Sequence, residues 1–384
     1  MAAKYPLQWI ELSRSALNCN VDSLVRLARG RQIAICVKAN AYGHGLPQIV
    51  EMLSQRSDIH YLSVHSVAEA IACRKAGWNA RLLLLGPVAT EDIETIVECG
   101  FEPTISDAAF LERLGRAADK AKKRILTHLK LETGTNRQGI TESELPRFAE
   151  IYRKHQHLGK PYGASTHFAN IEDTTNHQYA EHQLRQFGKL VKAMKRLKIG
   201  PRICHTASSA ALILFEKTGF DLVRPGLAAY GHWPSKETYL SYRLSGGAND
   251  LFRPVLSWKS RLTQVKKLQP GEFVGYGCTY RTTAPARLGV VPVGYYDGYD
   301  RALSNCAHML VNGARAEVRG RVCMNLTMID ISNVRAARPG HVVTLIGSDH
   351  SETVSAEQIA IWSSTINYEV LARLSSETPR IMVE

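Results

Sequence analysis

Short apolar runs alternate with longer helical patterns between about residue 33 and residue 226, and this alternation constrains the fold more than any other feature. Eight runs have the length and composition of strands: Ile33–Val37, Tyr61–Val64, Arg81–Leu85, Phe101–Ile105, Ile125–Leu131, Tyr162–His167, Arg202–His205 and Leu222–Arg224. The segments between them have the apolar spacing of helices: Leu46–Gln55, Val67–Ala76, Glu91–Glu98, Asp107–Lys122, Glu142–Lys154, Tyr179–Leu197 and Ser209–Glu216. Strands joined by helical crossovers pair in parallel, and eight such units are the number in a closed barrel. The sequence therefore predicts an α/β fold with an N-terminal (β/α)8 TIM-type barrel, and a doubly wound open sheet is the alternative.

The chain changes character after Trp233-Pro234, where helical periodicity gives way to alternating and β-branched runs. These runs are Leu256–Leu268, Arg287–Val293, Met309–Val311, Ala316–Arg321, Leu326–Ile331 and Val342–Ile346. Asn312-Gly313 lies between two of them and predicts a type I′ hairpin turn, and Ser355–Trp362 has the pattern of a short helix. We therefore expect a barrel over residues 1–240 and a C-terminal, mainly β domain over residues 241–384, with residues 1–12 pairing with the β domain.

The eight cysteines are scattered along the chain and form no C-x-x-C pair, so neither a zinc site nor a disulfide framework is indicated. We expect reduced, mostly buried thiols and no metal site. No apolar run has the length of a membrane span, and the first residues lack the hydrophobic stretch of a signal peptide. A cytoplasmic protein is the expectation.

The formal net charge of +13 is compatible with contact to a nucleic acid or another acidic surface. The basic residues, however, gather on helix-like stretches such as residues 120–124 and 189–196. Leu190, Met194 and Leu197 share one face of the second stretch, so its lysines cover the opposite, solvated face. No aromatic and basic residues are interleaved as in an RNA-binding sheet. We predict neither a nucleic acid nor a membrane as a partner.

Lys38 follows the first strand-like run directly and precedes a short turn that contains two glycines, Ala39–Gly45. Burial disfavours the charged form of a lysine, and a neutral amine can condense with an aldehyde. Pyridoxal 5'-phosphate is the commonest aldehyde cofactor for such a lysine. A lysine that snorkels out of a strand end is an equally good interpretation of this residue by itself.

Other chemically capable side chains also follow predicted strands, which is where a barrel places its active groups. They are Lys130 and Arg137 around the end of the fifth strand, His167 at the end of the sixth, Ser208 and Ser209 after the seventh, and Arg224 and Gly226 after the eighth. The loops after the last two strands are the usual phosphate site of such barrels, and the two serines begin a helical segment. A helix N-cap is the alternative role for these serines.

The chain resembles the alanine racemases, which are pyridoxal-phosphate enzymes with a barrel and a β domain. The resemblance covers almost the whole length, through residues 9–12, the Lys38 motif, and motifs at 129–137, 165–169, 205–210, 223–231, 274–277, 292–298, 320–324 and 366–369. Each motif is weak alone, but their joint order and spacing are specific. The resemblance implies interconversion of L-alanine and D-alanine, which supplies D-alanine for peptidoglycan, by a homodimer with shared active sites.

By this resemblance, Lys38 holds the cofactor covalently and then acts as one acid/base group, and Tyr276 of the partner subunit is the other. Racemisation takes a proton from one face of the α-carbon and returns one to the opposite face, so two opposed groups suit the reaction. Arg224 is implied as the partner of the cofactor's pyridine nitrogen, which an always charged guanidinium does not protonate. His167 is implied to bond Arg224 and to tune Tyr276 through the same network.

Further roles carry over from the family by position. Arg137 is implied to meet the cofactor's phenolic oxygen and the substrate carboxylate, and Lys130 matches a lysine that is often carbamylated. An unmodified lysine with a chloride ion nearby is the alternative at that position. The phosphate is assigned to Tyr42, Ser209, Gly226, Leu227 and Tyr368. Met324 of the partner subunit is implied to offer its backbone N–H to the substrate, and Tyr295 to line the entrance.

The sequence departs from the family at Ser208, where asparagine is usual, and at Gly275, where serine is common. Thr135-Asn136 replaces a methionine and a small residue, and Asn325 stands in place of an aspartate. These departures leave the substrate range less defined than cofactor use. The alternatives are a broader amino-acid racemase, for example of serine, a pyridoxal-phosphate-dependent decarboxylase, and a non-enzymatic carrier of the cofactor.

Overall fold

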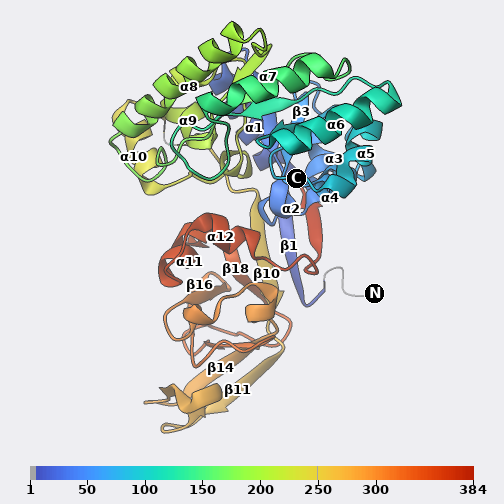
Figure 1. Ribbon diagram of the computed structural model, residues 1–384. Helices are drawn as coiled ribbons and strands as arrows, with labels where there is room; N and C mark the ends of the chain where they lie inside the picture. The colour runs from blue at the N-terminus through green and yellow to red at the C-terminus, as the bar shows by residue number, and fades with distance from the viewer. Residues whose placement is uncertain (1–5, 249) are drawn as a thin grey trace. The chain divides into compact units, whose positions relative to one another are not determined.

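The structure is a computed structural model that describes residues 6–248 and 250–384, and it divides the chain into two compact units (Figure 1). The barrel unit comprises Leu17–Ala39 and Ile49–Arg253. The β unit comprises the described residues of Met1–Ala16 together with Asn40–Gln48 and Pro254–Glu384. Two segments that are distant in sequence, the N-terminal strand and residues 40–48, therefore belong with the C-terminal residues.

Eight parallel strands form the sheet of the barrel unit in the order β8-β7-β6-β5-β4-β3-β2-β9. They are β2 (Gln32–Cys36), β3 (Tyr61–Val64), β4 (Arg81–Leu84), β5 (Glu102–Ile105), β6 (His128–Lys130), β7 (Gly163–Ser165), β8 (Ile203–His205) and β9 (Leu222–Val223). Two backbone hydrogen bonds bring the β9 segment back to the β8 segment, from Asp221 N–H to Cys204 O (3.1 Å) and from Arg224 N–H to Ala207 O (2.9 Å). The sheet is thus nearly closed, which confirms the predicted (β/α)8 barrel over an open sheet.

Helices α4 to α8 lie on the outer side of this sheet (Figure 1). The helices between β1 and β10 are α1 (Arg14–Ala28), α2 (Lys38–Tyr42), α3 (Leu46–Ser54), α4 (Val67–Lys75), α5 (Ile93–Cys99), α6 (Ala108–Ala121), α7 (Leu145–Lys154), α8 (Gln178–Arg196), α9 (Ser209–Leu214) and α10 (Lys236–Leu244). Local capping fixes several starts, since the side chain of Asp107 accepts from Phe110 N–H (2.9 Å) before α6. The apolar periodicity of the sequence predicts α3 to α9 to within a few residues.

The interior of the barrel combines apolar side chains with buried polar ones. One buried cluster consists of Ala34, Tyr61, Leu83, Ile203 and Leu222. The imidazole of His128 on β6 is also fully buried. On the adjacent strand β7, the missing side chain of Gly163 makes room for it, because a Cβ at Gly163 would overlap the Nδ1 atom of His128.

We expect Gly163→Ala to destabilise the protein by about 1–3 kcal/mol, because the new methyl group must displace a buried imidazole. Gly188→Ala is the matched control, since Gly188 lies inside α8 and a Cβ there would meet nothing within 4 Å. Alanine at such a helix position is about 0.5–1 kcal/mol more favourable than glycine. Denaturant unfolding measures both changes, and an unfolding midpoint of Gly163→Ala equal to that of the wild type would contradict the tight fit.

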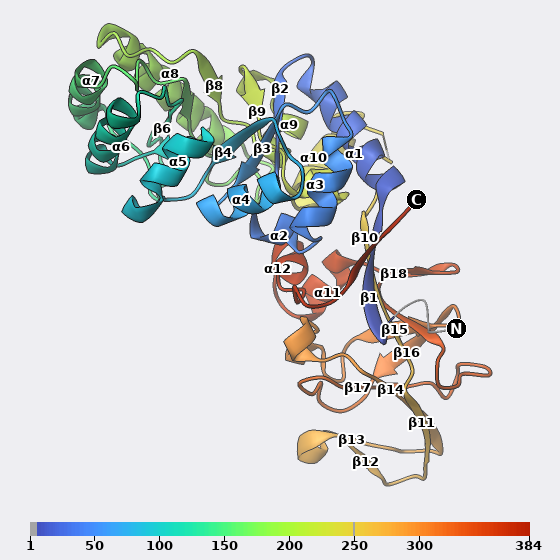
Figure 2. The same cartoon turned by 90° about the vertical axis from the view of Figure 1, so that its right-hand side faces the viewer.

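A ten-stranded mixed sheet forms the β unit, with the main order β11-β14-β17-β16-β15-β18-β10-β1-β20 (Figure 2). The strands are β1 (Gln8–Ser13), β10 (Leu256–Arg261), β11 (Gln264–Leu268), β14 (Ala286–Val291), β15 (His308–Val311), β16 (Ala314–Val318), β17 (Thr327–Asp330), β18 (Val342–Asp349), β19 (Glu352–Val354), which pairs with β18, and β20 (Arg380–Val383). The N-terminal strand β1 pairs antiparallel with β10 and parallel with β20. The predicted C-terminal, mainly β domain is confirmed.

Smaller elements complete the β unit: the hairpin of β12 (Phe273–Val274) and β13 (Tyr280–Arg281), and the helices α11 (Ala356–Trp362) and α12 (Asn367–Ala372). The turn between β15 and β16 has positive φ at both Asn312 (51°) and Gly313 (74°), which confirms the type I′ hairpin. Residues 40–48 pack against α12 and β20. A Cβ at Gly43 would overlap the Leu371 carbonyl oxygen, and Arg380 Nη2 donates to Gly43 O (2.8 Å).

Besides the short helices α2 and α12, two longer helices lie where the sequence did not predict them. The first is α1, and the second is α10, which lies just after the point where helical periodicity was expected to end. In α10 the only buried residue is Thr238, so its apolar stripe is too weak to detect. Local contacts define it instead, because the Ser235 hydroxyl accepts from Thr238 N–H (2.9 Å) and Trp233 packs on Tyr239 at a ring distance of 5.2 Å.

All eight cysteines are free, but the expectation of mostly buried thiols is wrong. Only Cys36 and Cys73 are buried, whereas Cys99, Cys278 and Cys306 are exposed. Within residues 6–248 and 250–384, no helix combines the length and the apolar character that crossing a bilayer requires.

Candidate active site

Lys38 is the first residue of α2 and lies just beyond the carboxyl end of β2. The carboxylate of Glu69 on α4 fixes the backbone next to it, because it accepts from Ala39 N–H (2.7 Å) and from His65 N–H (2.6 Å). Since His65 follows the neighbouring strand β3, Glu69 ties together the ends of two adjacent strands. This bridge holds the backbone of Lys38 at the rim of the barrel.

The residues after Lys38 form a left-handed turn rather than an ordinary helix. Ala39, Asn40, Ala41 and Tyr42 have φ values of 53–54°. Non-glycine residues disfavour this conformation by roughly 1–2 kcal/mol each, so the surrounding structure must impose it. Asn40 contributes locally, because its backbone carbonyl accepts from Gly45 N–H (2.9 Å) and its side-chain Oδ1 accepts from Leu46 N–H (2.8 Å).

Four positively charged side chains gather around His167, which directly follows β7. They are Lys130, Arg224, Arg137 and Lys38, in decreasing order of their effect on the imidazole. Burial, and then these four charges, hold the pKa of His167 well below its usual value, so its imidazole is neutral at neutral pH. The residues come from four different strand ends or loops of the barrel, and the closure of the sheet brings them together.

Lys130 is the last residue of β6 and belongs to this cationic cluster. Burial holds the pKa of its ammonium group well below the usual value, and the charges of Arg224 and Arg137 lower it further, while Glu132 opposes them. A lysine with a lowered pKa has a larger neutral fraction, and the neutral amine is the nucleophilic form.

The guanidinium of Arg224 is almost completely buried and uses four of its five N–H donors inside the barrel unit. Its Nη1 donates to His205 Nδ1 (2.5 Å) and to His205 O (2.7 Å), and its Nη2 donates to Thr166 O (3.0 Å) and Thr206 O (3.4 Å). No acceptor for the Nε–H is found in the described part of the chain. His205 therefore takes the place that the family resemblance assigned to His167 as the bonding partner of Arg224. Burial lowers the pKa of Arg224 to about 10, which still leaves it charged at neutral pH.

A buried glutamine that the sequence did not single out holds the loops around this cluster. Gln183 on α8 donates through Nε2 to Thr133 Oγ1 (3.3 Å), Thr135 Oγ1 (3.2 Å) and His167 O (3.3 Å). Its Oε1 accepts from Ala169 N–H (2.9 Å). Gln183 therefore joins the loop after β6 to the loop after β7. The available signal was a polar residue on the apolar face of a helix, one turn before the buried aromatic side chain at position 187.

The departure from the family at Thr135-Asn136 has a structural role here. The Thr135 hydroxyl donates to His167 O (2.6 Å), and Asn136 adopts a positive φ of 52°, which asparagine tolerates. A cavity of about 270 Å³ opens next to this loop, and Arg137 and His167 are among its lining residues. The carboxylates of Glu172 and Asp173 also line this cavity, so Arg137 is the group there that suits an anionic oxygen.

The candidate phosphate residues fall into two groups. In the barrel unit, the Ser209 hydroxyl oxygen accepts from Gly226 N–H (2.9 Å) and from Ala228 N–H (3.3 Å), next to Leu227. The side chain of Ser208 makes no capping bond to α9, so the alternative role as a side-chain N-cap is not seen. In the β unit, Tyr42 and Tyr368 lie together, with ring centroids 6.1 Å apart.

Three further candidates are exposed on the β unit. Tyr276 is 68% exposed, Met324 55% and Tyr295 41%. Two of their segments run side by side, because Tyr295 N–H donates to Cys323 O (3.0 Å). Gly275, which departs from the family's serine, has φ of 72°, a conformation that favours glycine.

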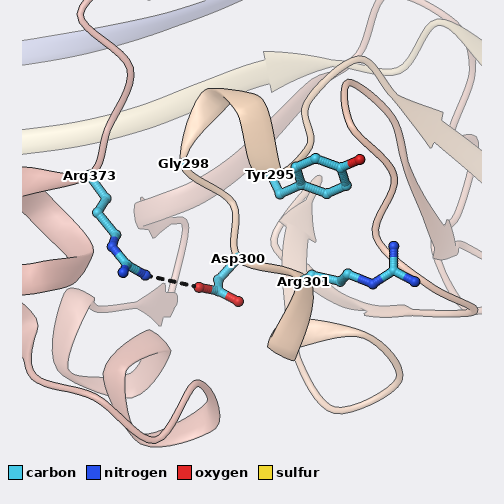
Figure 3. Close-up of a pocket in the computed structure, with 5 residues that line it drawn as sticks. All are labelled: Tyr295, Gly298, Asp300, Arg301 and Arg373. Carbon is cyan, nitrogen blue, oxygen red and sulfur yellow. Dashed lines mark hydrogen bonds and ion pairs between the residues drawn. The ribbon is translucent and has the colours of Figure 1, made fainter.

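Tyr295 also lines a cavity of about 520 Å³ in the β unit, drawn in Figure 3. Arg373 reaches Asp300 on one side of this cavity, with Nη1 3.4 Å from Oδ2, and Arg301 lies on the other side (Figure 3). Charged side chains of both signs therefore line this cavity together with Tyr295.

A (β/α)8 barrel followed by a mixed β domain, with a cationic cluster at the carboxyl ends of the barrel strands, defines a class of two-domain enzymes. The profile described as "Alanine racemase, N-terminal domain" matches residues 12–234, and "Alanine racemase, C-terminal domain" matches residues 255–382. This chain belongs to the alanine racemase family, whose members are isomerases that depend on pyridoxal phosphate.

Individual relatives support the assignment of this chain to the family. An alanine racemase of Leptospira interrogans (strain Fiocruz L1-130) is 35% identical over 386 residues, which cover 98% of this chain and 96% of that one. One from Halothermothrix orenii is 34% identical and covers 97% of this chain and 96% of that one. The solved alanine racemase of Clostridium difficile 630 has a TM-score of 0.91 at 28% identity, over 100% of this chain and 97% of that one. The solved alanine racemase of Bacillus anthracis with bound L-Ala-P has a TM-score of 0.90 at 30% identity. This match covers 100% of this chain and 96% of that one.

Proposed function

We propose that this chain interconverts L-alanine and D-alanine with pyridoxal 5'-phosphate, and that the D-alanine serves peptidoglycan synthesis in the cytoplasm. The main support is the convergence of Lys38, Arg137 and Arg224 around a neutral His167 in a member of this family, with Lys130 beside them. A cofactor with a phosphate and a phenolate, and a substrate with a carboxylate, match this excess of positive charge. The relative from Bacillus anthracis binds L-Ala-P, an alanine analogue, which supports alanine as the substrate.

Pyridoxal phosphate, when bound, supplies an electron sink for breaking the C–H bond at the α-carbon. In our proposal Lys38 holds the cofactor covalently, and Arg224 offers its remaining Nε–H to the pyridine nitrogen. With its other four donors fixed and its pKa still about 10, Arg224 donates a hydrogen bond without giving up a proton. His167 lies next to Arg224, on the side of the site where the pyridine nitrogen would be bound.

Two side chains would move the proton. Lys38 acts on one face of the α-carbon and Tyr276 of the partner subunit acts on the other, because racemisation needs access to both faces. The phenol of Tyr276 is 68% exposed on its own chain, which suits a group that completes a site on another copy. The proposed enzyme is therefore a homodimer with shared active sites.

The remaining roles follow the same logic. Arg137 would meet the cofactor's phenolic oxygen and the substrate carboxylate, and Met324 of the partner subunit would offer its backbone N–H to that carboxylate. Tyr295 would line the entrance. The phosphate would be held by Tyr42, Ser209, Gly226, Leu227 and Tyr368.

The proposed function is tested by following the formation of D-alanine from L-alanine with and without added pyridoxal phosphate. Parallel assays with serine measure the breadth of the racemase, and CO₂ release from ornithine or lysine tests a decarboxylase. Absence of racemisation in a protein that carries the cofactor would refute the proposal and leave the carrier as the alternative.

We expect Lys130 to be carbamylated, because its lowered pKa leaves a neutral amine beside Arg137. The amine adds to CO₂ and releases one proton, and the resulting carbamate is an anion that would pair with the guanidinium of Arg137. A ¹³C NMR signal from protein equilibrated with ¹³C-bicarbonate measures it, and Lys130→Arg should lack that signal. If the signal persists in Lys130→Arg, or is absent from the wild type, the modification is not at this lysine and the chloride alternative is favoured.

A further inference from the structure

A chain of buried polar side chains extends from Arg224 across the interior of the barrel. Beyond its bond to Arg224, His205 contacts His128, with Nε2 of His205 2.8 Å from Nδ1 of His128. His128 Nε2 lies 2.9 Å from Oε2 of Glu102, and Arg81 Nε donates to the other oxygen of that carboxylate. The strands β5, β6 and β8 and the segment after β9 each contribute one member to this relay, which we define as Glu102, His128, His205 and Arg224.

The chemistry of the two ends fixes the direction of every hydrogen bond in the relay. A guanidinium only donates, so His205 Nδ1 must accept from Arg224 and its proton must sit on Nε2. His205 Nε2–H then donates to His128 Nδ1, which leaves the proton of His128 on Nε2. A carboxylate only accepts, so Glu102 receives this last N–H. The guanidinium at one end and the carboxylate at the other therefore require the same direction for every hydrogen bond. Each imidazole uses one nitrogen as a donor and the other as an acceptor.

Both imidazoles are held neutral. Burial is the main cause that lowers the pKa of His128, and the charges of Arg81 and Arg224 lower it further, against Glu102. Burial also holds the pKa of His205 well below its usual value, together with the charges of Arg224 and Lys130 and the neighbouring His128. His128 and His205 are completely buried and Glu102 is 3% exposed. The carboxylate of the relay, Glu102, lies two neutral rings away from Arg224 and forms an ion pair with Arg81.

The barrel is shaped around this relay. Gly163 leaves the space that the His128 ring occupies, and the two imidazole rings meet edge to face at a centroid distance of 4.9 Å. Barrel interiors are ordinarily filled by branched apolar side chains, and burying polar groups is unfavourable unless all of them are bonded. A relay whose carboxylate and imidazoles are all bonded, and which ends on Arg224, indicates a role in orienting that guanidinium rather than in packing alone.

We propose that Glu102 and His128 are positioning residues for Arg224: through His205 they fix the guanidinium so that its Nε–H remains for the cofactor's ring nitrogen. This inference rests on the proposed function, because it assigns Arg224 to the pyridoxal ring. Neither Glu102 nor His128 touches the cofactor in this proposal. They act by setting the tautomer of His205, as a carboxylate orients a metal-binding histidine from behind.

The first test is the tautomer of the two histidines in the full-length wild-type protein. Long-range ¹H–¹⁵N NMR of protein labelled with ¹⁵N-histidine, assigned with His128→Asn and His205→Asn, distinguishes the protonated from the bare ring nitrogen. We expect both rings to be neutral with the proton on Nε2 at neutral pH. A proton on Nδ1 of His205, or a doubly protonated ring, would overturn the relay whether or not any variant folds.

The second test is Glu102→Gln, which keeps the shape but removes one acceptor. Because Arg81 only donates, the amide oxygen should face Arg81 and the amide NH₂ should face His128. That order reverses both imidazoles and places a proton between His205 Nδ1 and Arg224. We expect reversed tautomers and a fall in kcat of roughly tenfold to a hundredfold, the range seen when a carboxylate behind a functional histidine is removed.

Glu112→Gln is the matched control, because Glu112 also lies next to a histidine, with Oε2 3.3 Å from His155 Nε2, but on the outer helices. It should leave the tautomers of the relay and kcat unchanged. Unchanged tautomers in folded Glu102→Gln would refute the positioning role. The NMR spectra need neither cofactor nor substrate, so a wrong tautomer reports failure of the relay, whereas correct tautomers without racemisation report failure of the proposed function.

Discussion

Lys38→Ala should lower racemisation by at least about a thousandfold and abolish the Schiff-base absorbance of the cofactor. The physical reason is that the variant lacks both the covalent attachment and one of two proton-transfer groups. Lys38 lies at the rim of the barrel, where the charges of Arg137 and Arg224 are already present to hold an anionic ligand. Weak, non-covalent binding of the cofactor is therefore expected to remain in the variant.

Lys75→Ala is a suitable control, because Lys75 is an exposed lysine in the last turn of α4, in the same compact unit. It should leave both absorbance and turnover unchanged. Borohydride reduction of the wild type followed by peptide mapping should find the cofactor on the peptide that contains Lys38. Normal absorbance and turnover in Lys38→Ala, or a label on another lysine, would refute the assignment.

Tyr276→Phe should leave the absorbance of the bound cofactor unchanged and reduce racemisation by roughly a hundredfold to a thousandfold, the scale of a lost acid/base group. Solvent deuterium exchange should fall much more for one enantiomer than for the other, since only one face of the α-carbon loses its group. Tyr296→Phe is the matched control, because Tyr296 is also exposed on the β unit and donates to Glu377 (3.1 Å). A mild and equal loss with both enantiomers would remove Tyr276 from the reaction.

A mixing experiment separates a shared site from a site within one chain. Lys38→Ala and Tyr276→Phe chains are unfolded together and refolded, so that half of the dimers contain one chain of each kind. If Tyr276 serves the partner's site, each mixed dimer has one intact site, and about a quarter of wild-type activity should return. If both residues serve the same chain, each chain in the mixture carries one defect and no activity returns.

The elements that the sequence predicted best are those whose signals are local. The helix periods and the Asn312-Gly313 turn each depend on residues within a few positions of one another. The left-handed turn after Lys38 was not predicted, because alanine, asparagine and tyrosine have no local preference for positive φ over four residues. Contacts of Gly43 with α12 and β20 impose it from segments more than 300 positions away.

The candidate site shows the same division. The residue types and the motif spacing predicted five site residues: Lys38, Lys130, Arg137, His167 and Arg224. The order of the strands predicted that they lie at one end of the barrel. Which of them bond was not predictable: Arg224 bonds His205, 19 positions away, rather than His167. Gln183 and Glu102 were not singled out, since a buried polar residue is recognised only once its partners are known.

The sequence by itself determined the order of strands and helices, the two-domain organisation of the fold class and the chemical groups available at the strand ends. Only the tertiary structure decided the hydrogen-bond partners, the direction of the histidine relay and the conformation after Lys38. The reason is that periodicity and turn chemistry act between near neighbours, whereas His128 and His205 are 77 positions apart and meet only through the register of the closed sheet.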